Sequence, residues 1–190
     1  MKDDLFMKTA QMAISDDELN QSVKEHVEYI DRVFEKEKKK SFIPSLSVMS
    51  LKKYEGKRKE SLIVFADFDE NRHKLLLNLG EQWGNSKQFF PVCVTLMSEA
   101  WTRSFKNMKE HTKDKISDYN DKSEVIIVAA MTFDCRTSMA MIKIHRAKDN
   151  TIILDPKPMF NPYTGKSLIE TNLVANFYKG YQNVLRQRST

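Results

Sequence analysis

The sequence has few cysteines and no long hydrophobic run. Only 2 of its 190 residues are cysteines, too few for a disulfide framework, so a reducing cytoplasm is the expected location. The longest strictly apolar run covers residues 125–131, well short of the roughly 20 residues that a transmembrane helix needs, and we expect no membrane partner. The chain has 5 glycines and 5 prolines, which excludes a collagen-like protein. Residues 1–14 contain Asp3 and Asp4 and lack the apolar stretch of a secretion signal.

In other respects the amino-acid composition is that of an ordinary globular protein. Hydrophobic residues make up 41% of the chain and charged residues 30%. A chain of this length fits one domain, at roughly 150 residues per domain. We predict an N-terminal arm over residues 1–14 and a single domain over residues 15–190.

Periodicity predicts three helices. Ser15 and Glu18 form a capping box before apolar residues at steps of three and four, which predicts a helix from about residue 16 to 39. A middle helix follows Asp67 or Asp69 and ends near Gly84. A second capping box at residues 167–170 predicts a C-terminal helix that continues to about residue 186.

The remaining apolar segments predict strands. Residues 41–51 contain a proline and suit an edge strand, whereas the apolar run 61–66 suits a buried strand. Further strands are expected at 92–97, 124–133, 138–146 and 151–154, with a long polar loop over 102–123. The fold class is therefore α+β: a largely antiparallel mixed sheet of about five or six strands, packed with the three helices.

The net charge of +5 is unevenly distributed. Residues 36–60 hold nine basic and three acidic side chains, a local charge of +6. Such a segment is a candidate nucleic-acid surface. Alternatively, the first cations only offset the dipole at the end of a helix and the rest belong to a solvated turn. The candidate residues are Lys36, Lys38, Lys39, Lys40, Lys52, Lys53, Lys57, Arg58 and Lys59.

Gly165, Lys166 and Ser167 resemble the end of a phosphate-binding P-loop. The complete motif needs a glycine five residues before Gly165, where this chain has Phe160, and Pro162 removes an amide that would contact phosphate. A glycine turn followed by a serine cap explains the three residues equally simply. They remain a candidate site for a loosely held anion at a helix N-terminus.

Thiol and metal chemistry have little support in the sequence. Cys135 and His145 are ten residues apart, about 33 Å along a strand, so they cannot hydrogen-bond within one hairpin. The four histidines have no ligand spacing and the cysteines are not paired in sequence. We expect no metal site and no cofactor.

Acidic residues at predicted strand ends are the remaining catalytic candidates. Glu99 follows an apolar strand and precedes Trp101, while Asp134, Arg136 and Asp155 lie at the ends of other strands. Such residues suit a hydrolase-type general acid, because a carboxyl group beside an indole can have a raised pKa. The alternative is an ion pair between Glu99 and Arg136 that fixes strand order.

The segment 91–101, which ends in Ser-Glu-Ala-Trp, and the later apolar strand 124–131 resemble a pattern in uncharacterised phage and prokaryotic proteins. The similar part covers roughly residues 75–154. The resemblance implies a phage or mobile-element origin and nominates Glu99 and Trp101 for testing, but it implies no activity.

Three functions follow from these observations. The first is a non-enzymatic interaction or oligomerisation module, in which the amphipathic first helix or the 102–123 loop docks on another protein or on a second copy. The absence of a catalytic motif favours this function over an enzyme. The second is nucleic-acid binding through the basic segment, and the third is a hydrolase centred on Glu99.

Overall fold

The computed structural model describes residues 14–37, 39–52, 55, 57–65, 71–86, 88–103, 122–162 and 172–188. Most of the predicted N-terminal arm and residues 104–121 of the predicted loop lie outside these ranges. The elements, in chain order, are α2 (Asp16–Lys36), β1 (Ser45–Lys52), β2 (Arg58–Val64), α3 (Arg72–Asn85), β3 (Phe89–Arg103), β4 (Lys122–Thr132), β5 (Thr137–Arg146), β6 (Ile152–Leu154), β7 (Met159–Asn161) and α4 (Asn172–Gln187).

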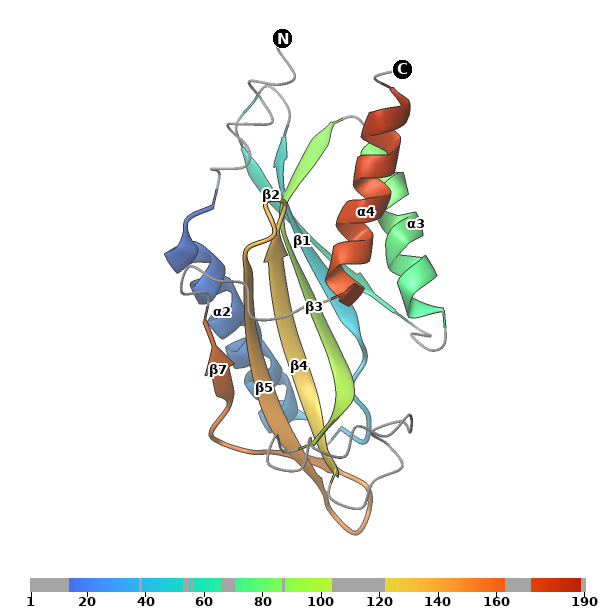
Figure 1. Cartoon of the computed structure of the whole chain (residues 1–190). Helices are drawn as coiled ribbons and strands as arrows, with labels where there is room; N and C mark the ends of the chain where they lie inside the picture. Colours follow the sequence, from blue (N-terminus) through green and yellow to red (C-terminus); the bar gives the residue numbers. More distant parts are fainter. Residues whose placement is uncertain are drawn as a thin grey trace.

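One antiparallel sheet forms the centre of the molecule (Figure 1). Its seven strands run in the order β2-β1-β3-β4-β5-β6, and β7 also pairs with β5. All the strand pairs are antiparallel. The predicted α+β class is confirmed, with slightly more strands than expected.

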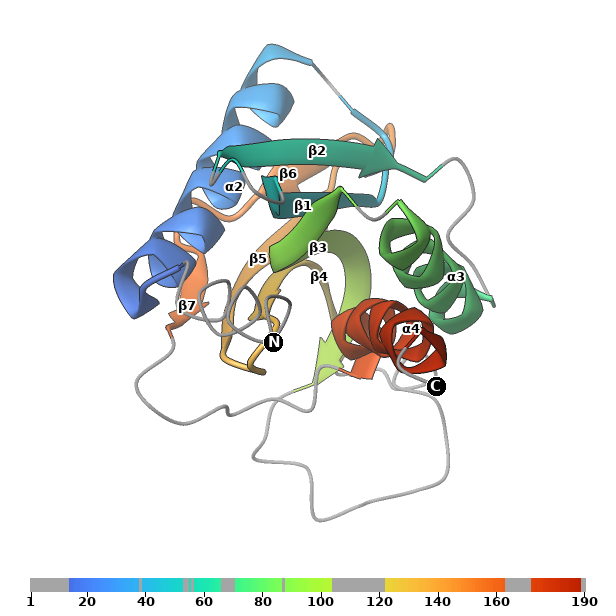
Figure 2. The ribbon, with the colours of Figure 1, turned by 90° about the horizontal axis from the view of Figure 1, so that it is seen from above.

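Helices cover both faces of this sheet (Figures 1 and 2). Side chains along a strand alternate between the faces. In β3, Cys93 and Met97 therefore pack in the cluster that contains the apolar residues of α2, whereas Val94 and Leu96 pack in the cluster of α3 and α4. The sheet thus separates two hydrophobic cores.

The α2 helix begins as the sequence predicts. The Ser15 hydroxyl accepts a hydrogen bond from the Glu18 N–H, and the Glu18 carboxylate accepts one from the Ser15 N–H. Leu19, Val23 and Ile30 are buried against the sheet. The helix ends at Lys36, about one turn earlier than predicted.

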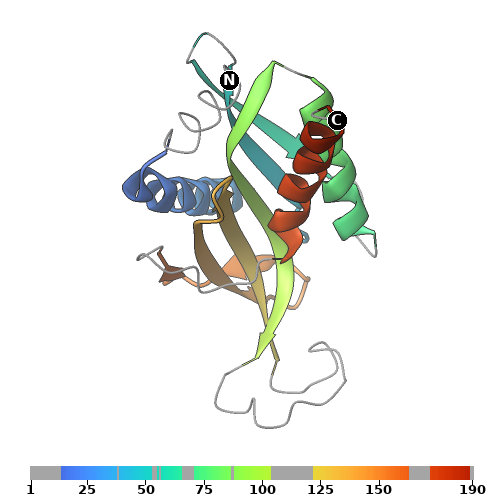
Figure 3. The ribbon, with the colours of Figure 1, turned by 45° about the horizontal axis from the view of Figure 1, so that its top comes forward.

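The helices α3 and α4 form a close pair on the opposite face (Figure 3). Their contact is closest at Gly80 and Gly180. A Cβ atom at Gly80 would lie 1.9 Å from the Phe177 carbonyl oxygen, and one at Gly180 would lie 1.9 Å from that of Leu77. The pair can approach this closely only because both positions lack a side chain.

Two strand predictions are wrong: the predicted edge strand lies inside the sheet, and the predicted buried strand lies at its edge. The predicted edge strand is β1, which lies inside the sheet between β2 and β3, because Pro44 precedes its first residue and leaves the hydrogen-bond ladder intact. The predicted buried strand is β2, the outermost strand. Its Leu62 and Val64 side chains are 51% and 58% exposed.

Candidate functional site

The outer edge of β2 carries backbone groups that point away from β1. Phe65 donates its N–H to the Pro44 carbonyl, and Lys52 donates its N–H to the Lys57 carbonyl. Residues 57 and 65 therefore face β1, and in an antiparallel pair the facing side alternates with every residue. The N–H and C=O groups of Leu62 and Val64 consequently point outward. Among the described residues, no strand pairs with this edge.

The opposite edge of the sheet is protected against the addition of a strand. There β6 and β7, of three residues each, pair with different parts of β5. Short edge strands are a common way to prevent unwanted strand pairing. In contrast, β2 is seven residues long and has exposed apolar side chains. It is the edge on which an added strand fits best.

A groove lies between α2 and β2. It consists of two hollows of about 380 and 140 Å³, and Tyr29 of α2 and Leu62 of β2 line both. Ile43 and Val64 extend the apolar lining toward the end of α2. Tyr29, Ile43, Leu62 and Val64 all have large exposed surfaces. This groove and the free edge form one continuous candidate site.

One end of the groove is polar. His26 on α2 places Nδ1 2.7 Å from the Ser22 carbonyl oxygen and Nε2 3.6 Å from the Glu60 carboxylate. The hydroxyl of Ser47 on β1 donates a hydrogen bond to the same Glu60 oxygen, at 2.5 Å. In a serine hydrolase the histidine stands between the serine and the acid. Here the acid stands between them, so His26 is not placed to take a proton from Ser47.

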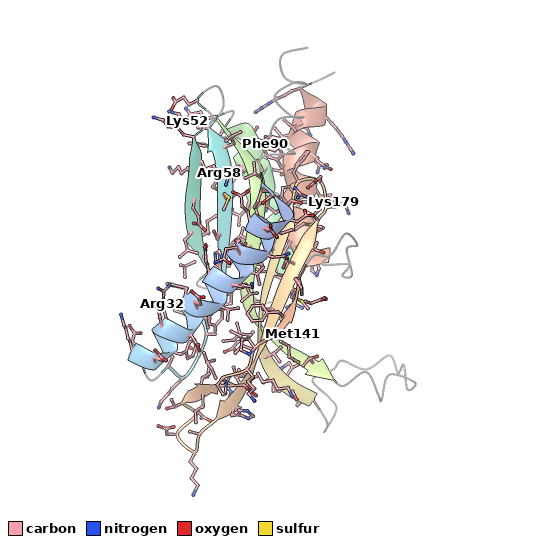
Figure 4. The ribbon with its side chains drawn as sticks, turned by 90° about the vertical axis from the view of Figure 1, so that its left-hand side faces the viewer. Arg32, Lys52, Arg58, Phe90, Met141 and Lys179 are labelled. Atoms are coloured by element: carbon pink, nitrogen blue, oxygen red, sulfur yellow. The ribbon has the colours of Figure 1, made fainter. Side chains whose placement is uncertain are left out.

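An ion pair joins the two walls of the groove. Arg58 of β2, which is labelled in Figure 4, donates to the Glu18 carboxylate at the start of α2, at 2.7 Å. The hydrogen bond from Arg58 and that from the Ser15 N–H lower the pKa of Glu18 to about 2. Sequence analysis missed this pair and the His26–Glu60 contact, because residues of α2 and β2 are about 35–40 positions apart and share no local pattern.

Arg136 secures the beginning of α2. Its guanidinium lies 2.6 Å from the Asp16 carboxylate and 2.9 Å from that of Asp134. It also donates to the Ile14 carbonyl, at 2.9 Å. Two of the catalytic candidates, Asp134 and Arg136, thus fix the helix to the turn between β4 and β5.

Arg146, at the far end of β5, secures the chain that follows α2. It donates to both oxygens of Glu124 and, at 2.9 Å, to the Lys40 carbonyl. Glu99 lies 3.7 Å from Arg146 and accepts a hydrogen bond from the Phe42 N–H at 3.0 Å. These contacts hold the connection between α2 and β1 against the sheet.

The expected Glu99–Arg136 ion pair is therefore wrong. Glu99 meets Arg146, and Arg136 lies at the opposite end of the ten-residue β5, roughly 30 Å away along the strand. Asp155 accepts a hydrogen bond from the Lys157 N–H in a turn after β6. The four catalytic candidates do not share one site.

The aromatic residue that the resemblance nominates lies beside Glu99. Trp101 is 43% exposed, and the Lys122 ammonium lies 4.6 Å from the centre of its ring. This cation–π contact joins the ends of β3 and β4, so it has a structural explanation.

The basic candidates form two separate groups. Lys36, Lys39 and Lys40 lie near the end of α2, while Lys52, Lys57, Arg58 and Lys59 lie at the β1–β2 turn. The eight residues of β1 separate these groups by roughly 24 Å. Several of the cations have partners: Lys39 pairs with Glu37, Lys52 with Glu55 and Arg58 with Glu18. Lys38, Lys53, Gly165, Lys166 and Ser167 lie outside the described residues.

The thiols are not placed for catalysis. Cys93 is buried, and burial raises the pKa of its thiol to about 12. Cys135 is exposed in the turn before β5, while His145 lies near the far end of that strand. In the part of the chain that the structure describes, no cluster of three or more histidine, cysteine or acidic side chains could hold a metal ion.

Comparison of the chain with protein-family models, curated proteins and solved structures found no match. The predicted phage or mobile-element origin stays a prediction. Within the described ranges, no helix has the length and hydrophobicity that a membrane crossing requires.

Proposed function

We propose that this protein is an interaction module that binds an extended segment of a partner protein along the outer edge of β2. The observation that supports this function is a seven-residue edge strand with outward backbone groups, next to an apolar groove. An added strand would gain main-chain hydrogen bonds from the edge and would place every second side chain over the groove.

The site differs from the one that the sequence favoured. The apolar face of the first helix was the expected docking surface, but Leu19, Val23 and Ile30 are buried on the sheet of the same chain. The proposed site instead uses the other side of α2, where Tyr29 faces Leu62 across the groove. Edge strands that expose backbone groups and apolar side chains are ready templates for pairing.

The proposed location is the cytoplasm. Cys93 and Cys135 are free cysteines, and a reducing compartment keeps such residues as thiols.

Amide hydrogen exchange tests the proposed function. The probes are eight-residue peptides in which apolar residues alternate with polar ones, together with scrambled peptides of the same composition. We expect the alternating peptides to slow exchange at the amides of Leu62 and Val64. The amide of Ile63 should change little, because it already faces β1. Equal effects of alternating and scrambled peptides would contradict the proposal.

Two variants locate the binding. Leu62→Pro removes an outward N–H and leaves the β1 ladder intact, so it should abolish the peptide effect while the fold is retained. Ile153→Asn is a control for substitution of an exposed apolar strand residue, because Ile153 is 53% exposed on β6 at the opposite edge of the sheet. We expect it to bind the peptides as the wild type does. Loss of binding in the control and not in Leu62→Pro would place the site elsewhere.

A further inference from the structure

The polar end of the groove carries two carboxylates. Glu25 of α2 and Glu60 of β2 both line the larger hollow, of about 380 Å³. The apolar part of the same lining comes from Tyr29, Leu62 and Met97. A lysine or arginine side chain suits such a hollow, because its methylene stem packs on apolar groups while its charged end meets the carboxylates.

The Glu60 carboxylate is held in place and is still accessible. Its Oε1 accepts the hydrogen bond from the Ser47 hydroxyl and lies 3.6 Å from His26 Nε2. Neither contact involves Oε2, and the Glu60 side chain is 55% exposed. A side chain that is already ordered loses little conformational entropy when a ligand binds to it. Glu60 can therefore bind a cation through Oε2 without losing either contact.

The backbone of β2 determines which partner side chain lies beside Glu60. The backbone groups of Glu60 point outward like those of Leu62 and Val64, because the facing side alternates along the strand. In an added antiparallel strand, the residue directly opposite Glu60 has its side chain on the same face of the sheet, with the two Cβ atoms about 5 Å apart. This is the face of α2, since Glu60 meets His26 there. The residue opposite Glu60 therefore directs its side chain into the polar end of the groove.

One orientation and one register of the added segment agree with these positions. All the strand pairs of the sheet are antiparallel, which is the slightly more stable pairing. An antiparallel segment then has, from its N-terminus and at alternate positions, apolar residues opposite Val64 and Leu62 and a basic residue opposite Glu60. A slip by two residues would set the basic residue opposite Leu62 or opposite Arg58, and like charges directly opposite each other are destabilising. The charge on the segment thus selects its register.

We propose that the edge of β2 binds antiparallel partner segments with the pattern apolar-x-apolar-x-basic, where x is any residue and the basic side chain reaches Glu60 and Glu25. This inference rests on the proposed function, because it names the chemistry of the segment that occupies the same edge. The two apolar side chains pack beside Val64 and Leu62. An acidic residue in place of the basic one is repelled by the two carboxylates.

Fluorescence anisotropy with labelled peptides measures this preference. The first peptide has eight residues and blocked ends, with valine at the second and fourth positions, arginine at the sixth and threonine elsewhere. Two further peptides carry glutamine or glutamate in place of the arginine. We expect the arginine peptide to bind about fivefold more tightly than the glutamine peptide, and the glutamine peptide about fivefold more tightly than the glutamate peptide. The chain as a whole has a net charge of +5, so a general attraction would give the opposite order.

Variants of the two carboxylates locate the cation. Glu60→Gln and Glu25→Gln should each reduce the advantage of the arginine peptide, and the double variant should abolish it. Glu28→Gln is the matched control, because Glu28 is also exposed on α2 but lines neither hollow. It should keep the full advantage, and circular dichroism controls for loss of the fold. A double variant that still prefers arginine to the same extent would place the cation elsewhere and overturn the inference.

Peptides of reversed sequence test the orientation. Their valines can still lie opposite Leu62 and Val64, but the arginine then lies beyond Val64 and away from Glu60. Exchange of this arginine for glutamine should therefore leave the affinity unchanged. An arginine advantage in the reversed peptides only would indicate a parallel segment and overturn the proposed orientation.

The outcomes separate this preference from the proposed function. If the three peptides bind equally and all slow exchange at the amides of Leu62 and Val64, the proposed function stands and the basic residue is overturned. An arginine preference without protection of these amides would mean that the carboxylates bind a cation away from the edge, which overturns the inference. If no peptide binds, both proposals fall.

Discussion

Alanine at Gly80 or Gly180 should destabilise the protein, although alanine is the better helix former. An added Cβ would lie 1.9 Å from a carbonyl oxygen of the facing helix at either position. Carbon–oxygen contacts need about 3.3 Å, so the helices would have to separate by about 1.4 Å. Overpacking of this kind costs about 1–3 kcal/mol or more, whereas the gain in helix propensity is about 1 kcal/mol.

Separation of α3 from α4 also disturbs the hydrophobic core between these two helices and the sheet. Leu76 and Phe177 are completely buried between this helix pair and the sheet, and they lose contacts when the pair opens. We expect each single variant to lower the free energy of unfolding by about 2 kcal/mol, which combines overpacking and lost contacts after the propensity gain. The double variant should cost less than the sum, since both substitutions push the same helices apart.

Urea unfolding followed by circular dichroism measures this effect. With a slope of about 2 kcal/mol per molar urea, the midpoint should fall by about 1 M in each single variant. Gly84→Ala is the internal control, because an added Cβ would lie 3.0 Å from the Val184 Cβ and 3.3 Å from the Tyr181 carbonyl oxygen, so the facing helix needs to shift by only a few tenths of an ångström. It should change stability by less than about 1 kcal/mol. A Gly80→Ala or Gly180→Ala protein as stable as the wild type would refute the close helix contact.

Three further substitutions, one of them with a control variant, test the contacts around the sheet. Arg136→Leu removes the charged hydrogen bonds at the start of α2 and should cost about 2 kcal/mol in urea unfolding, whereas Arg32→Leu on the exposed side of the helix should stay within about 0.5 kcal/mol. The lowered pKa of Glu18 means that its ion pair stabilises the fold above pH 4.5 and that this contribution is lost as the pH falls toward 2. The free energy of unfolding of Glu18→Gln should therefore be lower than that of the wild type at neutral pH, and the two values should converge in acid. The difference should be under about 1 kcal/mol, because the pair is nearly half exposed. Tyr178→Phe removes the hydrogen bond that the buried hydroxyl donates to the Met131 carbonyl and should lower the thermal midpoint, at a cost of about 1 kcal/mol; an unchanged midpoint would show that this bond contributes nothing.

Local signals in the sequence predicted the elements well. The capping box at Ser15 predicts the start of α2, because both of its hydrogen bonds are made within four residues. The sequence also predicts the middle helix and its end near Gly84, and the helix ends one residue later, at Asn85. Gly84 itself lies inside the helix and packs against α4. A glycine that permits close packing and a glycine that ends a helix look alike without knowledge of the facing helix.

The residues of β2 do not by themselves show where this strand lies in the sheet. A short apolar run is expected of a buried strand, and Leu62 to Phe65 form such a run. Whether a strand is central or outermost depends on the pairing of distant segments, which the run itself does not encode. The partner of Glu99 was missed for the same reason, since Arg146 is 47 residues away and the sequence offers other distant arginines, such as Arg136. The candidate site was therefore the part that sequence reasoning could not locate.

The two arginines of β5 have a consequence for the order in which the chain folds. Arg136 holds a carbonyl group 122 positions earlier, and Arg146 holds one 106 positions earlier. Contacts of such long range carry a large loop-closure cost and slow folding. During synthesis α2 leaves the ribosome before β1, yet it lacks both anchors until β5 has emerged. Although α2 is made before every described strand, it is thus expected to be among the last described elements to dock. Until it docks, its apolar face and the sheet face that it covers stay exposed to other chains.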